Sequence, residues 1–220
     1  MKNHNNQTLV DKISFAKKLI RENLKKFPKN ALACSFGKDS MVLLDIARQV
    51  KKDIKVFSVL SDTEFDETLE FRDYIVKRWN LNYVEYMYKQ GKCPLKDCCR
   101  KKKVNKFKEA VANIDMWFSG IRNDESLTRK NLRWIEKKGG LIKVNPILCF
   151  TEKDIWRYIA IFGIPINPLY QLGYRSLSCK NCSTIEESGD ESERYGRWKG
   201  TQHEGQECGI HTCILKKKVK

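Results

Sequence analysis

Seven of the nine cysteines lie in polar stretches of the sequence, where packing in a core does not explain them. Cys98 and Cys99 stand in the segment CCRKKKV, and Cys179 and Cys182 form a CxxC pair eighty positions later. A CxxC pair can bring two thiolates to one metal, and a second pair of cysteines can supply the remaining ligands. Adjacent cysteines are atypical of a zinc ribbon. Chemistry alone leaves zinc, an iron–sulfur cluster and no metal as alternatives.

The segment CGIHTC, residues 208–213, follows a polar stretch that is punctuated by glycine and poorly suited to a core. One hypothesis is that Cys208 is a mobile nucleophile that reaches an active site formed elsewhere in the chain. The alternative is a pair of incidental thiols. Cys93 and Cys213 receive no role, although a disulfide between Cys208 and Cys213 would protect the nucleophile.

The segment SFGKDS, residues 35–40, lies between a short apolar run and a stretch with helical periodicity. A glycine at such a turn lets backbone N–H groups face a ligand, and the N-terminus of the following helix favours a phosphate. Lys38 and Ser40 can add further donors. The spacing is not that of a Walker A motif, and an ordinary strand–helix loop is the alternative interpretation.

Two more polar segments follow predicted strands. LSDTEF (60–65) contains Asp62 and Glu64, and SGIRND (119–124) contains Arg122. The carboxyl ends of parallel strands meet at one edge of an open α/β sheet, where the ligands of such folds bind. We therefore expect these segments to form one site with SFGKDS, the alternative for Arg122 being a solvated position in a turn.

The elements that must position these residues follow from the spacing of apolar side chains. It predicts helices at residues 8–26, 40–50, 68–80, 104–113 and from Thr151 onward, and strands at 31–36, 54–62, 82–88, 116–121 and 143–148. Strands that alternate with helices favour a parallel sheet with crossover helices, and continuously apolar strands indicate burial on both faces. The predicted fold class is α/β, a doubly wound, mainly parallel sheet with flanking helices and an irregular, cysteine-containing C-terminal extension.

The chain has 220 residues, of which 41% are hydrophobic, enough for one full core. We predict an N-terminal helix at residues 1–27, a nucleotide-binding domain at 28–162 and an extension at 163–220, within one structural domain overall. No apolar run approaches the roughly 18 residues of a membrane span, and residues 1–10 lack the apolar core of a signal peptide. We therefore expect a cytoplasmic protein without membrane attachment.

The formal net charge of +16 and the pI near 9.4 predict an anionic partner. The lysines are spread along the sequence, with short clusters only at Lys101–Lys103 and Lys216–Lys218. Charge alone leaves a nucleotide and a nucleic-acid polymer as comparable alternatives.

SFGKDS closely resembles the loop SGGKDS of the PP-loop superfamily, whose fold is adenine nucleotide alpha hydrolase-like. Four further segments follow in order: CCRKKKV, NPLYQLGYRSLSCKNC, ERYGRW and ECGIH. Together they resemble the signature of the iron–sulfur assimilatory adenylyl-sulfate reductases, which belong to the phosphoadenylyl-sulfate (PAPS) reductase family. The resemblance extends from about residue 28 to residue 212.

This resemblance implies a 4Fe-4S cluster held by Cys98, Cys99, Cys179 and Cys182, and it implies that Cys208 is the catalytic nucleophile. It implies an enzyme of sulfate assimilation that reduces adenosine 5′-phosphosulfate to sulfite and AMP through an S-sulfocysteine intermediate. A thioredoxin- or glutaredoxin-like protein would be the reductant. Nucleic acid is then not expected as a partner, and a homo-oligomer is compatible with the sequence.

The resemblance also assigns roles to basic residues. Lys103 matches a lysine between cluster and sulfate, and Arg122 lies in a matching substrate-binding loop. Arg194 and Arg197 match arginines that clamp the anionic groups of the nucleotide, a role that suits the planar fork of arginine. The residues expected to bind substrate are Ser35, Phe36, Gly37, Lys38, Asp39, Ser40, Asp62, Lys103, Gly120, Arg122, Arg194, Arg197 and His211.

One departure from the family pattern concerns the first loop. Adenylyl-sulfate reductases usually carry a degenerate loop there, whereas Lys38 and Asp39 are typical of PP-loop enzymes that cleave ATP. The alternatives are therefore a reductase of the 3′-phosphorylated substrate, PAPS, and an ATP pyrophosphatase acting in nucleic-acid thiolation. A zinc-stabilised nucleic-acid-binding domain would leave SFGKDS and ECGIH without a role.

Overall fold

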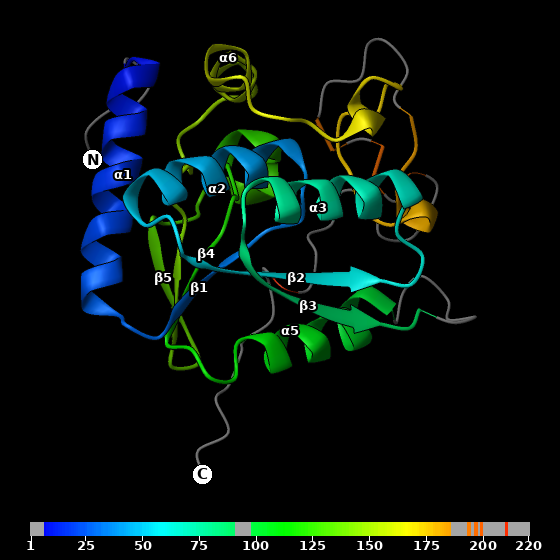
Figure 1. Ribbon diagram of the computed structural model, residues 1–220, viewed down its shortest axis with the longest axis horizontal. Coiled ribbons are helices and arrows are strands. Elements are labelled where there is room, and N and C mark those ends of the chain that lie inside the picture. Colours follow the sequence, from blue (N-terminus) through cyan, green and yellow to red (C-terminus); the bar gives the residue numbers. More distant parts are fainter. Residues whose placement is uncertain are drawn as a thin grey trace.

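The computed structural model describes residues 7–90 and 98–185, and beyond them Glu193, Arg194, Gly196, Arg197, Lys199 and Ile210; for residues 98–100 and Lys138 only the backbone is described. Its strands are β1 (Asn30–Ala33), β2 (Lys55–Ser61), β3 (Asn82–Tyr88), β4 (Met116–Phe118), β5 (Ile135–Lys138) and β6 (Leu141–Val144). They form one sheet in the order β3-β2-β1-β4-β6-β5 (Figure 1). Within these ranges every strand pairing is parallel except that of β5 with β6, which confirms the predicted fold class.

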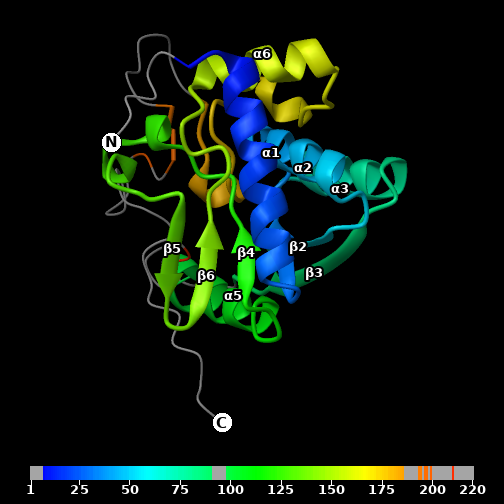
Figure 2. The same cartoon turned by 90° about the vertical axis from the view of Figure 1, so that its left-hand side faces the viewer.

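The α-helices are α1 (Leu9–Lys26), α2 (Lys38–Val50), α3 (Asp66–Arg78), α5 (Val104–Ala110) and α6 (Glu152–Phe162). Helices α1, α2 and α3 cover one face of the sheet, and α5 covers the other (Figure 1, Figure 2). Neighbouring side chains of β4 divide between the two faces: Phe118 packs in the core on the side of α1 and α2, and Trp117 packs around Phe107 of α5. This two-sided burial explains the continuously apolar strands.

The hairpin of β5 and β6 was not predicted. Gly139 and Gly140 connect the strands with φ values of 58° and 84°, a pair of left-handed conformations that favours glycine in a tight hairpin turn. Lys138 pairs with Leu141 across this turn. The strand expected at 143–148 is wrong in its bounds, because the chain turns after Val144 and the N–H of Leu148 bonds the carbonyl of Asn145.

The helices α6 and α5 begin in different ways. α6 begins at a capping box: the N–H of Asp154 donates to the Thr151 hydroxyl at 3.1 Å, and the N–H of Thr151 donates to the Asp154 carboxylate at 2.9 Å. α5 is shorter than the predicted helix 104–113 and follows directly on a π-helix, Cys98–Lys103. Cys98 and Cys99 therefore start the helical segment that runs into α5.

The residues described beyond α6 are irregular, as expected for this part of the extension. Gly163, with a φ of 58°, ends the helix, and short 3-10 helices follow at Pro168–Tyr170 and Lys180–Cys182. Ser183 forms an antiparallel bridge with Arg197, which places the segment of Arg197 beside the CxxC pair. Over the ranges given above, none of the helices is both long and apolar enough to span a membrane.

Candidate active site

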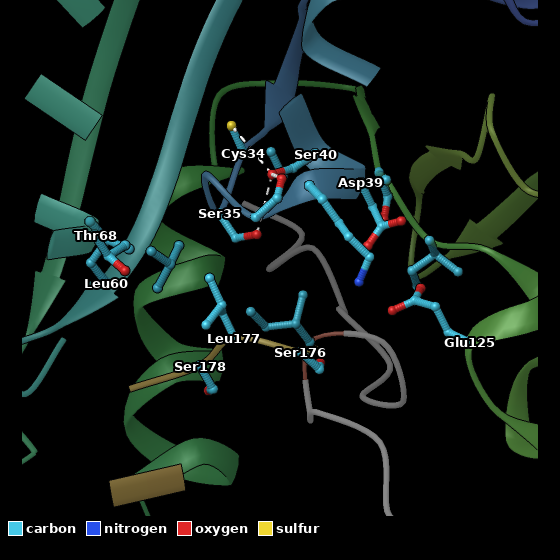
Figure 3. Close-up of a pocket in the computed structure, with 18 of the residues that line it drawn as sticks. Cys34, Ser35, Asp39, Ser40, Leu60, Thr68, Glu125, Ser176, Leu177 and Ser178 are labelled. Atoms are coloured by element: carbon cyan, nitrogen blue, oxygen red, sulfur yellow. Dashed lines mark hydrogen bonds between the residues drawn. The ribbon is translucent and has the colours of Figure 1, made fainter. Parts of the chain in front are cut away.

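A cavity of about 190 Å³ opens at the carboxyl ends of β1, β2 and β4 (Figure 3). Its walls come from the loop between β1 and α2, the loop after β4, α5 and the C-terminal extension. Nine residues that the sequence predicts to bind substrate line this cavity: Ser35, Gly37, Lys38, Asp39, Ser40, Lys103, Gly120, Arg194 and Arg197.

Hydrogen bonds hold the loop between β1 and α2 in shape. The Ser40 hydroxyl donates to the carbonyl of Gly37 at 2.9 Å and lies 3.3 Å from the Ser35 hydroxyl (Figure 3). The N–H of Lys38 donates to the hydroxyl of Tyr170 at 2.9 Å. A Cβ at Gly37 would lie 3.1 Å from that hydroxyl, which is closer than an ordinary contact. The Tyr170 hydroxyl therefore favours glycine at this position.

Phe36 carries backbone strain in the same loop. Its φ is 57°, a conformation that bulky residues rarely adopt and that is found at binding loops when the surroundings enforce it. Here the enforcement is burial: the ring is fully buried and packs edge-on against Tyr83. Phe36 thus faces the core and not the cavity.

Gly120 sits where two loops approach most closely. A Cβ on Gly120 would lie 3.3 Å from the Cα and the N of Ser40, both backbone atoms that cannot move aside alone. The absence of a side chain therefore lets the loop after β4 touch the first turn of α2.

Four ionic side chains form a network at the cavity, which we call the loop network: Lys38 and Asp39 line the cavity, and Arg122 and Glu193 lie behind them. The Lys38 Nζ lies 2.6 Å from Glu193 Oε1 and donates to the carbonyl of Arg175 at 2.7 Å. Arg122 is fully buried; its Nε donates to Asp39 Oδ1 at 2.5 Å and its Nη2 to the Glu193 oxygens at 2.5 and 2.7 Å.

The charges of the loop network stabilise one another. Burial alone would lower the pKa of Lys38 and of Arg122, but the carboxylates of Asp39 and Glu193 raise both pKa values above their ordinary range. Burial alone would raise the pKa of Asp39, but Arg122 and Lys38 hold it below its ordinary value. These three groups are therefore charged at neutral pH.

The remaining charged side chains of the cavity include both signs. The carboxylate of Glu125 contacts the guanidinium of Arg129, and its Oε1 lies 3.9 Å from Arg194 Nη1. Glu64 is 8% exposed and also lines the cavity, where burial raises its pKa against the opposing charges of Lys103 and Arg197. Lys103, Arg194 and Arg197 bring three cations to one cavity, which suits a ligand with adjacent anionic groups.

The CxxC cysteines lie on the α5 side of the sheet. Cys179 and Cys182 are each 2% exposed, and the N–H of Cys182 donates to the carbonyl of Cys179 at 2.9 Å. Both belong to the apolar cluster around Phe107 of α5, the helix that continues from Cys98 and Cys99. The side chains of Cys98 and Cys99 are outside the description. Among the side chains that are described, no group of three or more His, Cys, Asp or Glu is placed to hold a metal ion.

Several predicted site residues do not line the cavity in the described part of the chain. Arg122 lies behind Asp39 in the loop network, and the Asp62 carboxylate instead accepts the N–H of Gln90 at 2.7 Å. Cys208 and His211 fall outside the described residues. Ile210, which stands between them in the sequence, lines the cavity and packs in the cluster of Cys179 and Cys182.

Sequence reasoning overlooked several residues of the site. Glu193 begins ERYGRW, and Tyr170 lies within NPLYQLGY. The roles of a glutamate and a tyrosine depend on which residues they contact, and the sequence does not show those contacts. Glu64, rather than Asp62, is the carboxylate of LSDTEF that lines the cavity. The segment 176–178 also lines it, although none of its residues was assigned a role within NPLYQLGYRSLSCKNC (Figure 3).

Comparison with known proteins adds evidence independent of this geometry. Residues 29–185 match the phosphoadenosine phosphosulfate reductase domain. An adenosine 5′-phosphosulfate reductase from Bacillus cereus (strain AH187) is 35% identical over an alignment of 199 residues, which covers 81% of this chain and 82% of that protein.

Two solved structures share the fold at low sequence identity. Phosphoadenylyl-sulfate (PAPS) reductase from Candida auris, in a phosphate complex, has a TM-score of 0.65 at 19% identity, covering 77% of this chain and 90% of that chain. FMN adenylyltransferase from Candida glabrata, in complex with FAD and inorganic pyrophosphate, has a TM-score of 0.66 at 16% identity, covering 100% of this chain and 93% of that chain. The fold, the matched domain and the relative agree, and the chain belongs to the phosphoadenosine phosphosulfate reductase family.

Proposed function

We propose that this protein reduces adenosine 5′-phosphosulfate to sulfite and AMP. The observation that carries the proposal is the convergence of Lys103, Arg194 and Arg197 on the cavity beside the loop between β1 and α2. A phosphosulfate has two adjacent anionic groups, which one lysine and two arginine forks match in charge and in hydrogen-bonding geometry. The name of the Bacillus cereus relative supports the substrate without a 3′-phosphate.

The loop supplies the nucleotide-binding part of the proposed site. Ser35 and Ser40 line the cavity, and Gly37 and Gly120 let the Tyr170 hydroxyl and the backbone of Ser40 approach the loops that form it. The N-terminus of α2 adds partial positive charge there. The phosphosulfate then extends from the loop toward Lys103, Arg194 and Arg197.

The proposed chemistry has two steps. The Cys208 thiolate attacks the sulfate sulfur, so an S–S bond forms and the bond between sulfur and the bridging oxygen breaks, which releases AMP and leaves S-sulfocysteine. A thiolate of an external dithiol then attacks Cys208 Sγ, which releases sulfite and leaves a mixed disulfide with Cys208. The second thiol attacks the reductant sulfur of that disulfide, forms the reductant disulfide and frees the Cys208 thiolate. Two electrons pass from the dithiol to sulfur. The cations around the sulfate favour the thiolate form of the nucleophile.

The cysteines described fit the proposed 4Fe-4S cluster in chemistry and surroundings. Cys179 and Cys182 are buried among apolar side chains, as ligands of a shielded cluster are, and Cys98 and Cys99 start the helix on the same side of the sheet. When bound, the cluster would supply a fixed charge close to the sulfate site. The residues of this chain bind the substrate and form the covalent bond.

The reductant in this proposal is a thioredoxin- or glutaredoxin-like protein, and the compartment is the cytoplasm, where such dithiols are kept reduced.

An ATP pyrophosphatase is not favoured, because Lys38 and Asp39, the residues typical of it, are bound to Glu193 and Arg122.

The decisive experiment measures sulfite release on anaerobically purified protein with its iron quantified. We expect release from adenosine 5′-phosphosulfate with a dithiol, with a kcat/KM at least one hundredfold that for PAPS. Cys208→Ser should release none, whereas the matched variant Cys213→Ser should keep the wild-type rate. Wild-type release by Cys208→Ser would refute the mechanism, and a preference for PAPS would refute the substrate. Pyrophosphate release from ATP without sulfite release would replace the proposal with the pyrophosphatase.

A further inference from the structure

Glu193 holds two cations that face the loop between β1 and α2. Its carboxylate lies 2.6 Å from Lys38 Nζ and accepts hydrogen bonds of 2.5 and 2.7 Å from Arg122 Nη2, and its side chain is 5% exposed. Lysine and arginine are donors only, so a proton on Glu193 would find no acceptor in these partners. Burial raises the pKa of Glu193, and the charges of Lys38 and Arg122 oppose that rise, so these contacts favour the ionised carboxylate.

The loop network has no net charge, since Lys38 and Arg122 balance Asp39 and Glu193. Asp124, which lies 3.8 Å from Arg122 Nη1, is 53% exposed and belongs to the solvent side. The rest of the cavity is different: Lys103, Arg194 and Arg197 contribute three positive charges to its lining, against the carboxylates of Glu64 and Glu125 beside Arg129. Positive charge for a ligand is thus concentrated away from Lys38. A nucleotide with two anionic groups can place both near Lys103, Arg194 and Arg197. A triphosphate carries additional negative charges, for which the neutral loop network offers no net positive charge.

We propose that Glu193 is a specificity-determining residue, whose carboxylate takes the place of outer phosphate groups at Lys38 and Arg122 and so excludes nucleoside triphosphates. The inference deepens the proposed function. It rests on that function for the identity of the nucleotide that binds, but the exclusion of triphosphates does not depend on it.

The inference also gives Lys38 and Asp39 a role in a reductase. The Lys38 side chain is 2% exposed, and its ammonium contacts Glu193, the carbonyl of Arg175 and the face of the Tyr170 ring, 5.2 Å away. An incoming phosphate would have to displace the Glu193 carboxylate and would be repelled by it. Lys38 therefore anchors the segment that carries Arg194 directly, and Asp39 does so through Arg122, instead of binding ATP.

The test is calorimetric titration of the full chain with ATP and with AMP, without added metal. Glu193→Gln preserves the shape of the side chain and removes its charge, which leaves one positive charge in the loop network. We expect ATP to bind at least tenfold more tightly than to wild type, and AMP to change less than threefold. Asp154→Asn is the matched control, because Asp154 also lies 2.5 Å from a buried lysine, but that lysine, Lys12, does not line the cavity, whereas Lys38 does.

A second variant keeps the inference testable if Glu193→Gln does not fold. The double variant Lys38→Met/Glu193→Gln removes both partners and leaves the loop network neutral, so its ATP affinity should stay within threefold of wild type. A larger loss would show that Lys38 binds ATP in the wild-type protein and would overturn the inference. A gain below tenfold in folded Glu193→Gln, or an equal gain in Asp154→Asn, would overturn it too. Neither titration depends on sulfite release, so the two proposals fail separately.

Discussion

The hydroxyl of Tyr170 accepts a hydrogen bond of 2.9 Å from the backbone N–H of Lys38, 132 positions earlier in the sequence. Lys38 is the first residue of α2, and the first N–H groups of a helix have no partner within it. Tyr170 thus supplies the cap that Gly37, which has no side chain, cannot give. The C-terminal extension in this way completes the nucleotide loop.

This contact predicts a coupling between Tyr170 and Gly37. Tyr170→Phe removes the acceptor of a buried N–H and should lower the free energy of unfolding by about 1–2 kcal/mol. Gly37→Ala should cost about 1–2 kcal/mol, because its Cβ would lie 3.1 Å from the Tyr170 hydroxyl. In the double variant that hydroxyl is absent, so Gly37→Ala should lower the free energy of unfolding by about 1 kcal/mol less than it does in wild type. Urea denaturation of the four proteins measures this difference. Strictly additive costs would contradict the contact.

Glu64 predicts a pH dependence of substrate binding. Burial raises its pKa, and an ionised Glu64 in the cavity wall repels an anionic ligand, whereas a protonated one does not. Adenosine 5′-phosphosulfate keeps both charges over this range, so its affinity for the Cys208→Ser protein should rise as pH falls from about 8 to about 5. Glu64→Gln should bind it about tenfold more tightly at the upper pH and show a flatter profile. Identical profiles for the two proteins would exclude this role.

Asp154 predicts a stability change with acid. Burial alone would raise the pKa of Asp154, but the hydrogen bond from Lys12 at 2.5 Å and the N–H of Thr151 hold it below its ordinary value. A lowered pKa gives stability that is present above the unfolded pKa of about 3.9 and is lost as pH falls through the folded value. Asp154→Asn keeps the helix cap and should cost about 2 kcal/mol at neutral pH. This difference should shrink below about pH 4; a difference independent of pH would mean that the ion pair contributes nothing.

The cysteines predict a contrast in iron content. Cys182→Ser removes a proposed ligand and should abolish both bound iron and the visible absorption of the cluster. Cys34→Ser is the matched control, because Cys34 is equally buried and burial raises its pKa to about 11, which keeps it a neutral thiol. The measurement is iron per chain after anaerobic purification. Equal iron in the two variants would exclude Cys182 as a ligand.

Much of the fold follows from local patterns in the sequence. Apolar runs and helical spacing predict the parallel strands and the helices between them, because each signal lies within one element. The charged strand β5 has the sequence IEKK and was missed, since only Gly139 and Gly140 mark its turn. The hydrogen bonds that Lys38 donates to Tyr170 and Arg122 donates to Glu193 were missed for another reason. Each joins segments far apart in the sequence, and the acceptor lies in an extension that has no periodicity.

The position of β1 in the sheet has a consequence during synthesis. β1 is the first strand of the chain, yet it lies in the interior of the sheet between β2 and β4. At a ribosomal rate of about 5–20 residues per second, roughly 4–17 s pass between the synthesis of β1 and that of β4. Throughout that interval one edge of an apolar strand has no neighbour and can pair with another nascent chain. The length of chain between β1 and β4 therefore sets how long each new molecule is exposed to aggregation.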